Sequence, residues 1–537
     1  MNRILGRTIL ASSPTLLQQQ RRIISKISRY TSNSALATTN SANGRKERVG
    51  LYPGVPTYDL IRGWILYNLF RSNYLVENSI KALKFTERVV GQSLTESLLK
   101  ATVFGHFCGD ASEDGLRQKA EALTQRQMGT MFGYNSELME DDLATMSLEE
   151  RRVANTAKWY KVYANYLKSI DYAAQYTKDK PPFVACKLTS MVDTDVLRRL
   201  TTLLNYSDEV FKSYSTTSTS NDHHILNRHI SSPNMPFKSQ RLRETVTKLA
   251  DCRSKGSVDL VDWQNHFTVA NLDQLQLLLD EALPGVKRPD PLTDQEQQQV
   301  ELIMKRLNDI GEHAVAKDVR VLMDAEQTYY QPAIRSFMVH CMMKWYNKEK
   351  PVVYDTLQSY LKSSHQTMLL SHLSTKRNNC IYAVKLVRGA YMDEEKRLAI
   401  EHGCEDPIHS DKLATDGSFN RNADYLLSQD DIFVFLATHN NDSVQMTKEK
   451  IKEYNRSSQS GEVVFAQLMG MADYISSPLA YEGYLVYKLL TYGVVREVLP
   501  YLARRALENR GAMEGAQIER KLMGKEISQR LLGRSRR

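Results

Sequence analysis

Paired cysteines and long apolar stretches are both missing from this chain of 537 residues. Its six cysteines form no C-x-x-C pair. That pattern excludes a small disulfide-stapled scaffold, argues against a structural zinc site, and is typical of reduced thiols in an intracellular compartment. No apolar run approaches the ~20 residues that a membrane-spanning helix needs. We therefore expect that the protein binds no metal and is not an integral membrane protein.

The standard nucleotide-binding fingerprints are absent as well. No G-x-G-x-x-G follows a predicted strand, and no G-x-x-x-x-G-K-[S/T] occurs. A cofactor, if there is one, has to be bound by other means than a Rossmann turn or a P-loop.

Acidic residues are absent from the first 46 positions, which carry eight of the 71 basic residues. Subtracting those eight leaves 63 basic against 62 acidic residues, so the net charge of +9 belongs mostly to this leader. A nucleic-acid-binding face is therefore not expected. The leader is rich in arginine, serine and threonine and contains short apolar stretches, a composition that is typical of a mitochondrial transit peptide. We predict that residues 1–46 are such a peptide, disordered and cleaved between about 29 and 46; a plain basic tail is the alternative.

The rest of the chain divides into a helical part and an alternating part. Apolar residues recur every three or four positions in 47–180, which predicts an N-terminal helical region that ends at Pro181–Pro182. Seven short apolar strands follow, separated by helix-length sequence: 183–188, 319–323, 352–354, 381–387, 432–437, 463–468 and 485–490. Repeated βα units predict a parallel sheet, and the count favours an α/β fold with a (β/α)8 barrel over 181–515 whose eighth strand is hard to see.

An inserted helical segment is expected at 205–300, between the first two of these strands. Residues 251–262 have the outline of an EF-hand loop, with Asp251, Gly256, Asp259 and Asp262 at suitable positions. Two positions that should supply oxygen ligands are instead Arg253 and Lys255. We interpret the loop as a degenerate EF-hand that has lost its metal; chance resemblance is the alternative.

Polar residues end almost every predicted strand, where the chemistry of a barrel enzyme lies. Each one alone is more often half of a salt bridge than a functional group. Their convergence on one mouth points to a site, since burying so many charges without a ligand is costly. Two adjacent arginines on a later helix, Arg504 and Arg505, can hold a carboxylate from two directions, and Lys187 can add a third positive charge. A small anionic substrate is therefore expected.

Several of these segments together resemble the proline dehydrogenase family over about 181–515. The segments are ACKLTS (185–190), VLMDAE (321–326), KLVRGAYMDEEKRLA (385–399), LATHN (436–440), QLMGMAD (467–473) and YLARRALEN (501–509). With the leader, they are similar to the mitochondrial branch. The resemblance implies a distorted (β/α)8 barrel that binds FAD and oxidises L-proline to Δ1-pyrroline-5-carboxylate. It also implies that the protein lies in the mitochondrial matrix, associated with the inner membrane, and passes its electrons to ubiquinone there.

The resemblance also implies a role for each matching residue. Arg504, Arg505 and Lys187 would hold the substrate carboxylate, and Glu508 would orient Arg504. Tyr501 and Leu468 would pack on the substrate ring, and Asp324 and Tyr391 would order the mouth. The positions that match flavin contacts are Gln358, Lys385, Val387, Gly389, Thr438 and His439, with Lys385 near flavin N5.

One position departs from the family. The tyrosine that the family carries on the seventh predicted strand is Leu489 here, which leaves hydroxyproline open as the substrate. Tyr487 or Tyr492 could fill the gap instead, or the register could differ by two residues.

Other functions remain as alternatives. A Schiff-base aldolase on the same barrel, with Lys187 or Lys385 as nucleophile, would explain the lysines and the carboxylate clamp. A calcium-responsive scaffold is disfavoured by Arg253 and Lys255. The basic tail, 516–537, could lie on an anionic membrane as an amphipathic helix or could simply cap the fold.

Overall fold

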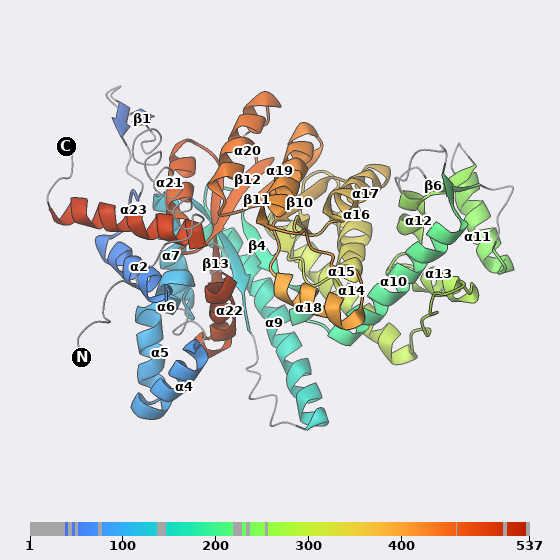
Figure 1. Cartoon of the computed structure of the whole chain (residues 1–537), viewed down its shortest axis with the longest axis horizontal. Coiled ribbons are helices and arrows are strands. Elements are labelled where there is room, and N and C mark those ends of the chain that lie inside the picture. Colours follow the sequence, from blue (N-terminus) through green and yellow to red (C-terminus); the bar gives the residue numbers. More distant parts are fainter. Residues whose placement is uncertain are drawn as a thin grey trace, which may run out of the picture.

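The computed structural model describes residues 38–40, 46–48, 52–72, 78–136, 147–217, 228–231, 237–252, 256–457, 459–508 and 513–532. Its centre is a closed barrel of eight parallel strands (Figure 1). The strands are β3 (Gly129–Tyr134), β4 (Phe183–Cys186), β8 (Arg320–Met323), β9 (Val353–Gln358), β10 (Tyr382–Val387), β11 (Ile432–Ala437), β12 (Val463–Leu468) and β13 (Val486–Tyr492). The predicted (β/α)8 barrel is confirmed.

The eighth strand is β3, which lies inside the region that we predicted to be helical. It closes the barrel by pairing with β13 on one side and β4 on the other. The predicted boundaries are therefore wrong here, because the barrel begins at 129 and not at 181. The strand escaped the apolar pattern because Gly129 and Gly133 face the interior. A Cβ on Gly129 would lie 2.2 Å from the Tyr487 ring, and one on Gly133 would lie 3.0 Å from Leu489.

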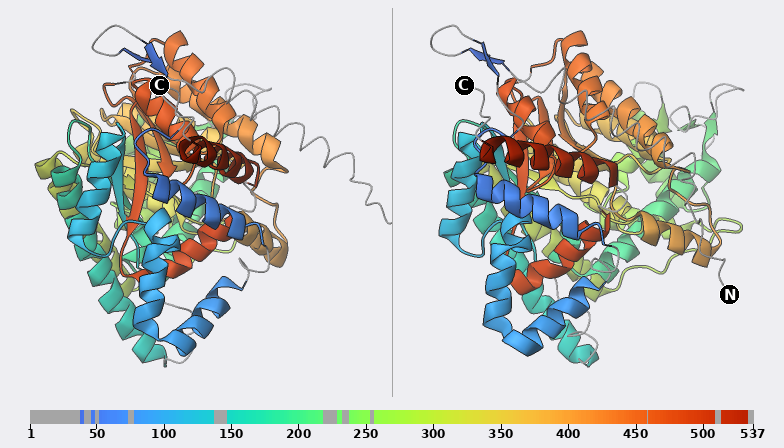
Figure 2. Two further views of the ribbon diagram at one scale, coloured as in Figure 1. Left: turned by 90° about the vertical axis from the view of Figure 1, so that its left-hand side faces the viewer. Right: turned by 60° about the vertical axis from the view of Figure 1, so that its left-hand side comes forward.

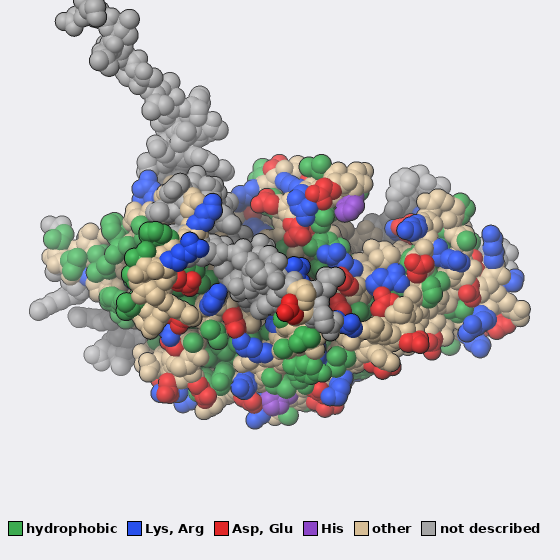
Figure 3. Space-filling view, turned by 90° about the horizontal axis from the view of Figure 1, so that it is seen from below, with side chains coloured by type: hydrophobic (Ala, Val, Ile, Leu, Met, Phe, Trp, Pro, Cys, Tyr) green, Lys and Arg blue, Asp and Glu red, His purple; other side chains and the backbone are tan. Residues whose placement is uncertain are grey.

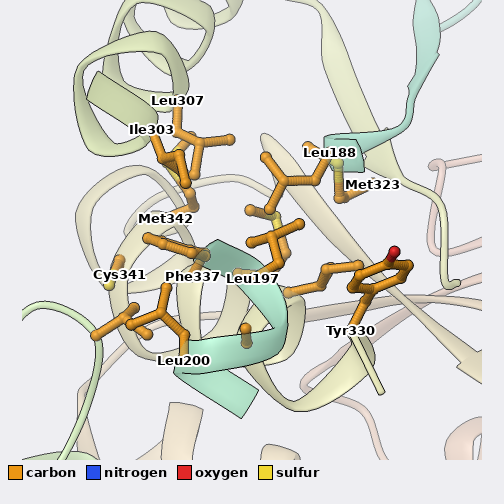
Figure 4. Packing of buried hydrophobic residues seen from close by; sticks show 14 of the residues in the cluster. Leu188, Leu197, Leu200, Ile303, Leu307, Met323, Tyr330, Phe337, Cys341 and Met342 are labelled. Atoms are coloured by element: carbon orange, nitrogen blue, oxygen red, sulfur yellow. The ribbon is translucent and has the colours of Figure 1, made fainter. Parts of the chain in front are cut away.

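Helices surround the barrel and connect its strands. In chain order they are α9 (Leu148–Tyr176), α10 (Thr194–Tyr214), α14 (Asp294–Lys317), α15 (Gln331–Phe337), α16 (Met343–Tyr346), α17 (Ser364–Arg377), α18 (Met392–His402), α19 (Lys412–Ser428), α20 (Asn441–Glu453), α21 (Asp473–Tyr481) and α22 (Val495–Glu508). Capping boxes begin the long helices α9 and α14, at Ser147–Glu150 and Thr293–Glu296. Figure 4 shows apolar side chains of α10, α14 and α15 converging in the core on one side of the barrel.

A group of helices precedes the barrel and one helix follows it. The first group is α2 (Thr57–Leu69), α4 (Ser79–Val90), α5 (Gln92–Ala101), α6 (Val103–Phe107) and α7 (Glu113–Gln125). The last helix, α23 (Met513–Leu531), runs alongside α2 (Figure 2), with Ile518 and Leu522 buried. Those apolar side chains are used inside the fold, which favours the capping alternative for the described part of the tail.

The insertion lies to one side of the barrel and is not purely helical as expected. Three short antiparallel strands, β5 (Thr216–Thr217), β6 (Arg228–Ser231) and β7 (Ser257–Asp259), accompany α11 (Gln240–Asp251), α12 (Leu260–His266) and α13 (Leu272–Leu277). The insertion also begins after α10, which continues to Tyr214 and so passes the predicted start at 205. Arg253 and Lys255 lie outside the described residues.

The two last acids of the EF-hand-like loop are paired with an arginine of the barrel. Arg377 of α17 contacts both carboxylate oxygens of Asp259, at 2.5 and 2.6 Å, and one of Asp262, at 2.9 Å. A guanidinium therefore holds the acids that a metal ion would need.

The leader falls mostly outside the described residues. Its described parts, β1 (Thr38–Asn40) and β2 (Lys46–Arg48), pair antiparallel, a feature that the prediction of disorder over 1–46 did not include. Among the described residues, no helix is long and apolar enough to cross a membrane. Basic and acidic side chains are interspersed on the face shown in Figure 3.

Candidate active site

The predicted strand-end residues share one rim of the barrel. All eight strands are parallel, so their carboxyl ends meet at the same mouth. Gln358, Val387 and Leu468 are the last residues of β9, β10 and β12. Lys187, Asp324 and Thr438 directly follow β4, β8 and β11. The fold thus brings together positions that are more than 280 residues apart in the sequence.

Lys385 lies inside β10 and pairs with Asp324 at the end of β8, the second strand along the barrel. Its Nζ is 2.5 Å from Asp324 Oδ1, and the side chains are 9% and 23% exposed. Lys385 lies two residues after Ala383, which belongs to the apolar cluster inside the barrel, so it faces the interior as the pleat requires. Asp324 therefore neutralises a nearly buried ammonium at the base of the mouth.

Glu326 ties three neighbouring strand ends together, a role that the sequence reasoning missed. Its buried carboxylate accepts hydrogen bonds from the N–H and the hydroxyl of Thr189, which follows β4. Its backbone carbonyl accepts a 2.8 Å bond from Gln358 Nε2. Burial raises the pKa of Glu326, and the positive charge of Lys187 opposes that shift. The segment VLMDAE could have indicated this role, because two acidic residues with one residue between them follow the same strand.

Arg388 fixes the end of β11 from the neighbouring strand. Its guanidinium pairs with Asp416 at 2.7 Å and donates to Thr438 Oγ1 at 2.7 Å and to Ser443 Oγ at 2.9 Å. It also lies over the ring of Phe419, with 4.4 Å to the ring centre. Arg388 belongs to the family-like segment 385–399, but the sequence alone predicted no role for it.

His439 connects β11 to the end of β12. The N–H of Leu468 donates to His439 Nε2 over 3.1 Å, so this nitrogen acts as an acceptor. Gln467, one residue earlier, is buried and donates to the carbonyl of Thr438 over 3.2 Å. The positions of Leu468 and His439 are therefore set by each other.

Gly389 follows β10 where the chain passes close to Tyr360. Its φ is +135°, and a Cβ there would lie 2.3 Å from Tyr360 Cδ1. The N–H of Tyr360 donates to the carbonyl of Arg388 at 2.7 Å, which fixes this close approach. Only glycine fits both the conformation and the space.

The predicted carboxylate clamp lies on α22, directly after β13. Tyr501 is partly buried and packs with Phe104, Cys108, Val498 and Leu502. The side chains of Arg504, Arg505 and Glu508 lie outside the described part of the structure. The helical backbone places Arg504 and Glu508 four residues apart on one face, as the predicted pairing requires. Tyr391 is the residue directly before α18, four residues after the end of β10.

Leu489 faces the barrel interior near its mouth. It pairs in register with Leu468 and packs with the interior cluster beside Ala437. Tyr487 lies deeper, and its hydroxyl donates to the carbonyl of Pro181, just before β4 begins. The Tyr492 hydroxyl bonds Ser169 of α9 at 2.7 Å, outside the barrel. The alternative that one of these two tyrosines fills the gap is contradicted, because both hydroxyls bond away from the interior side of the mouth.

The fold and the charged side chains at the carboxyl ends of its strands define a (β/α)8-barrel enzyme. Residues 117–517 match the family model described as proline dehydrogenase, and the chain belongs to that family. The predicted family and enzyme class are thereby confirmed.

Named relatives and a solved structure are similar to the chain. It is 27% identical over 559 residues to proline dehydrogenase 1, mitochondrial, of Drosophila melanogaster, covering 90% of this chain and 80% of the relative. It is 28% identical over 539 residues to hydroxyproline dehydrogenase of Xenopus laevis, covering 98% and 99%. Proline utilization A from Bdellovibrio bacteriovorus, inactivated by N-propargylglycine, superposes with a TM-score of 0.52 at 16% identity, which supports the fold alone. The match covers 84% of this chain and 36% of that longer protein.

Proposed function

We propose that the protein oxidises L-proline to Δ1-pyrroline-5-carboxylate with a bound FAD. The observation that carries the proposal is the nearly buried Lys385–Asp324 pair at the mouth of a barrel of this family. Burying an ammonium costs free energy unless another group compensates its charge. At this rim, Asp324 and a bound group can both interact with Lys385.

The residues at the rim fit a flavin in their chemistry. Gln358 offers an amide, Lys385 an ammonium and Thr438 a hydroxyl, which suit the carbonyl and nitrogen edge of the ring system and its phosphates. Gly389 lets the chain run close to a bound group, and Val387 and His439 complete the proposed contacts. When bound, FAD accepts the hydride from the ring carbon beside the substrate nitrogen.

The substrate would lie between the rim and α22. Arg504, Arg505 and Lys187 hold its carboxylate, while Glu508 orients Arg504 through their i,i+4 spacing. In the same proposal, Tyr501 and Leu468 pack on the ring, and Asp324 and Tyr391 order the mouth. Alignment is the main task of these residues, because the cofactor supplies the reactivity.

The electrons would pass to ubiquinone at the mitochondrial inner membrane, with the protein in the matrix and residues 1–46 as its transit peptide. Exposed apolar side chains on α4 and α5 support peripheral membrane contact, among them Phe85 (69% exposed) and Leu94 (65%). We expect Phe85→Ser with Leu94→Ser to weaken sedimentation with liposomes while proline oxidation with a soluble acceptor stays unchanged. Equal sedimentation of the variant would remove this surface from the proposal.

Hydroxyproline is the second candidate substrate. It is favoured by Leu489, which faces the interior where the family carries a tyrosine, and by the similarity to a relative named hydroxyproline dehydrogenase.

The visible flavin spectrum of the purified protein, recorded without oxygen, tests both candidates. Bleaching by L-proline supports the main proposal, and bleaching by hydroxyproline alone supports the second. A folded protein that binds no added FAD would overturn both. Covalent trapping with borohydride would then test the Schiff-base aldolase on Lys187 or Lys385.

A further inference from the structure

Two donors from the N-terminal helices converge on one carbonyl of the loop that follows β12. This loop runs from Met469 to Ala472, directly after Leu468, and leads into α21. His106 of α6 places its Nε2 3.1 Å from the carbonyl oxygen of Gly470. Tyr67 of α2 places its hydroxyl 3.2 Å from the same oxygen. A rim segment is thus held from outside the barrel, by helices that are 364 and 403 residues away in the sequence.

Glycines on both sides make room for this contact. Gly470 has a φ of +73°, and a Cβ there would lie 2.5 Å from the backbone oxygen of His106. A Cβ on Gly63 of α2 would lie 2.7 Å from His106 Cε1. The imidazole therefore occupies a slot between α2 and the loop that larger residues on either side would close.

The imidazole is a neutral donor in this slot. His106 is 7% exposed, and burial, aided by the charge of Arg62, lowers its pKa to about 4. A carbonyl oxygen can only accept, so the single N–H of the neutral ring lies on Nε2. The ring also meets Phe107 edge-on, with 4.6 Å between ring centres.

The same short helix also supports α22. Phe104 and Cys108 pack with Val498 and Leu502, on the helix that carries the proposed carboxylate clamp. The carbonyl of Gly105 is held by Lys119 Nζ at 2.9 Å and by Arg62 Nη2 at 3.2 Å. Helix α6 is therefore anchored at its own backbone and touches two elements of the mouth.

We propose that His106 is a positioning residue for substrate binding: its hydrogen bond to Gly470 fixes the loop that follows Leu468, relative to α22. This rests on the proposed function, in which Leu468 and α22 face the substrate from two sides. Loss of the bond leaves the barrel intact but lets one wall of the site move. The cost then falls on substrate binding more than on the chemical step.

The test compares His106→Leu with His106→Gln. Leucine fills the slot without a donor, whereas the glutamine amide can place an N–H where Nε2 lies. We expect His106→Leu to raise KM for L-proline about tenfold, the effect of about one lost hydrogen bond, with kcat changed less than about threefold. We expect His106→Gln to recover most of that loss.

A matched control is His372→Leu. This histidine is similarly buried, but it pairs with Asp431 just before β11, at the end of the barrel opposite to the mouth. We expect this variant to lower Tm while KM stays unchanged. If His106→Leu also lowers only Tm, or if His106→Gln binds proline no better than His106→Leu, the positioning role is wrong.

Should His106→Leu fail to fold, Tyr67→Phe removes the second donor to Gly470 without altering the slot. We expect it to raise KM by a smaller factor, and an unchanged KM there would overturn the proposal. Failure of the proposed function is seen separately, because wild-type flavin would then not be bleached by L-proline. If hydroxyproline alone bleaches the flavin, the KM values of the wild type and of the variants are compared with hydroxyproline as the substrate.

Discussion

A buried carboxyl on the last helix predicts that stability falls as the pH rises. Glu519 of α23 is 1% exposed and lies near Asp473, which Arg126 and Lys488 pair at 2.7 Å each. Burial, and then the negative charge of Asp473, raise the pKa of Glu519 above its usual range, although Lys488 opposes this. Tyr52 donates to one of its carboxyl oxygens at 3.1 Å, while the other has no hydrogen-bond partner among the residues that the structure describes. The folded protein therefore holds Glu519 protonated.

The sign of the effect follows from proton linkage. A carboxyl whose pKa is raised by folding contributes its full stability below the unfolded pKa, and this contribution is lost as pH rises toward the folded pKa. Within that window, the loss is about 1.4 kcal/mol for each pH unit. Glu519→Gln keeps an acceptor for Tyr52 and removes the titration. We expect the variant to match the wild type near the unfolded pKa and to gain on it steadily above.

The assay is thermal unfolding of wild type and Glu519→Gln, followed by circular dichroism at several pH values. Between about pH 5.5 and pH 7.5, the two proteins should separate by about 2–3 kcal/mol, a difference of a few degrees in Tm. A separation that stays constant across this range would refute the reasoning, because it would mean that Glu519 does not change its protonation on folding. Glu301→Gln on α14 is the control, since this side chain is exposed and its substitution should leave the pH dependence of Tm unchanged.

Three further outcomes are expected. Arg377→Met should cost about 2 kcal/mol of unfolding free energy, since it removes the positive charge that pairs the partly exposed Asp259 and the buried Asp262. Burial alone would raise the pKa of Asp259, but Arg377 holds it below its usual range. The wild-type advantage, measured by thermal unfolding, should therefore be present above pH 4 and fade as pH falls through that region; an advantage independent of pH would contradict this. Asp324→Asn removes the negative charge that pairs with Lys385 and should raise the midpoint potential of the bound flavin. An unchanged potential would argue against the proposed position of Lys385 beside the flavin. Gly389→Ala should lose flavin on purification because its Cβ would meet Tyr360; normal flavin content would contradict this.

The barrel could be predicted from the sequence because seven of its strands are recognisable as short apolar runs. Strands that are covered on both faces need apolar side chains throughout, and β10 to β12 agree with their predicted ranges to within a residue. The rule that barrel chemistry lies at carboxyl ends then selected Lys187, Asp324 and Gln358 correctly for the rim, from position alone. Their roles toward substrate and cofactor stay predictions.

The features that the sequence could not predict depend on contacts between residues that are far apart in the chain. Gly129 and Gly133 look like turn residues, and they are strand residues only because Tyr487 and Leu489 fill the space in front of them. His106 likewise carries no local signal. Its partner is a backbone carbonyl, and every residue offers one of those.

The same observation explains how the N-terminal helices would act on the proposed site although the family-like segments lie within about 181–515. Their contact with the rim passes through the carbonyl of Gly470 and through apolar packing on α22. Neither contact requires a particular partner side chain on the barrel. What it does require is space, and Gly63 and Gly470 provide that space on each side of His106. A helical region of this kind can vary widely in sequence and still fix the mouth, as long as a donor and two small residues remain in place.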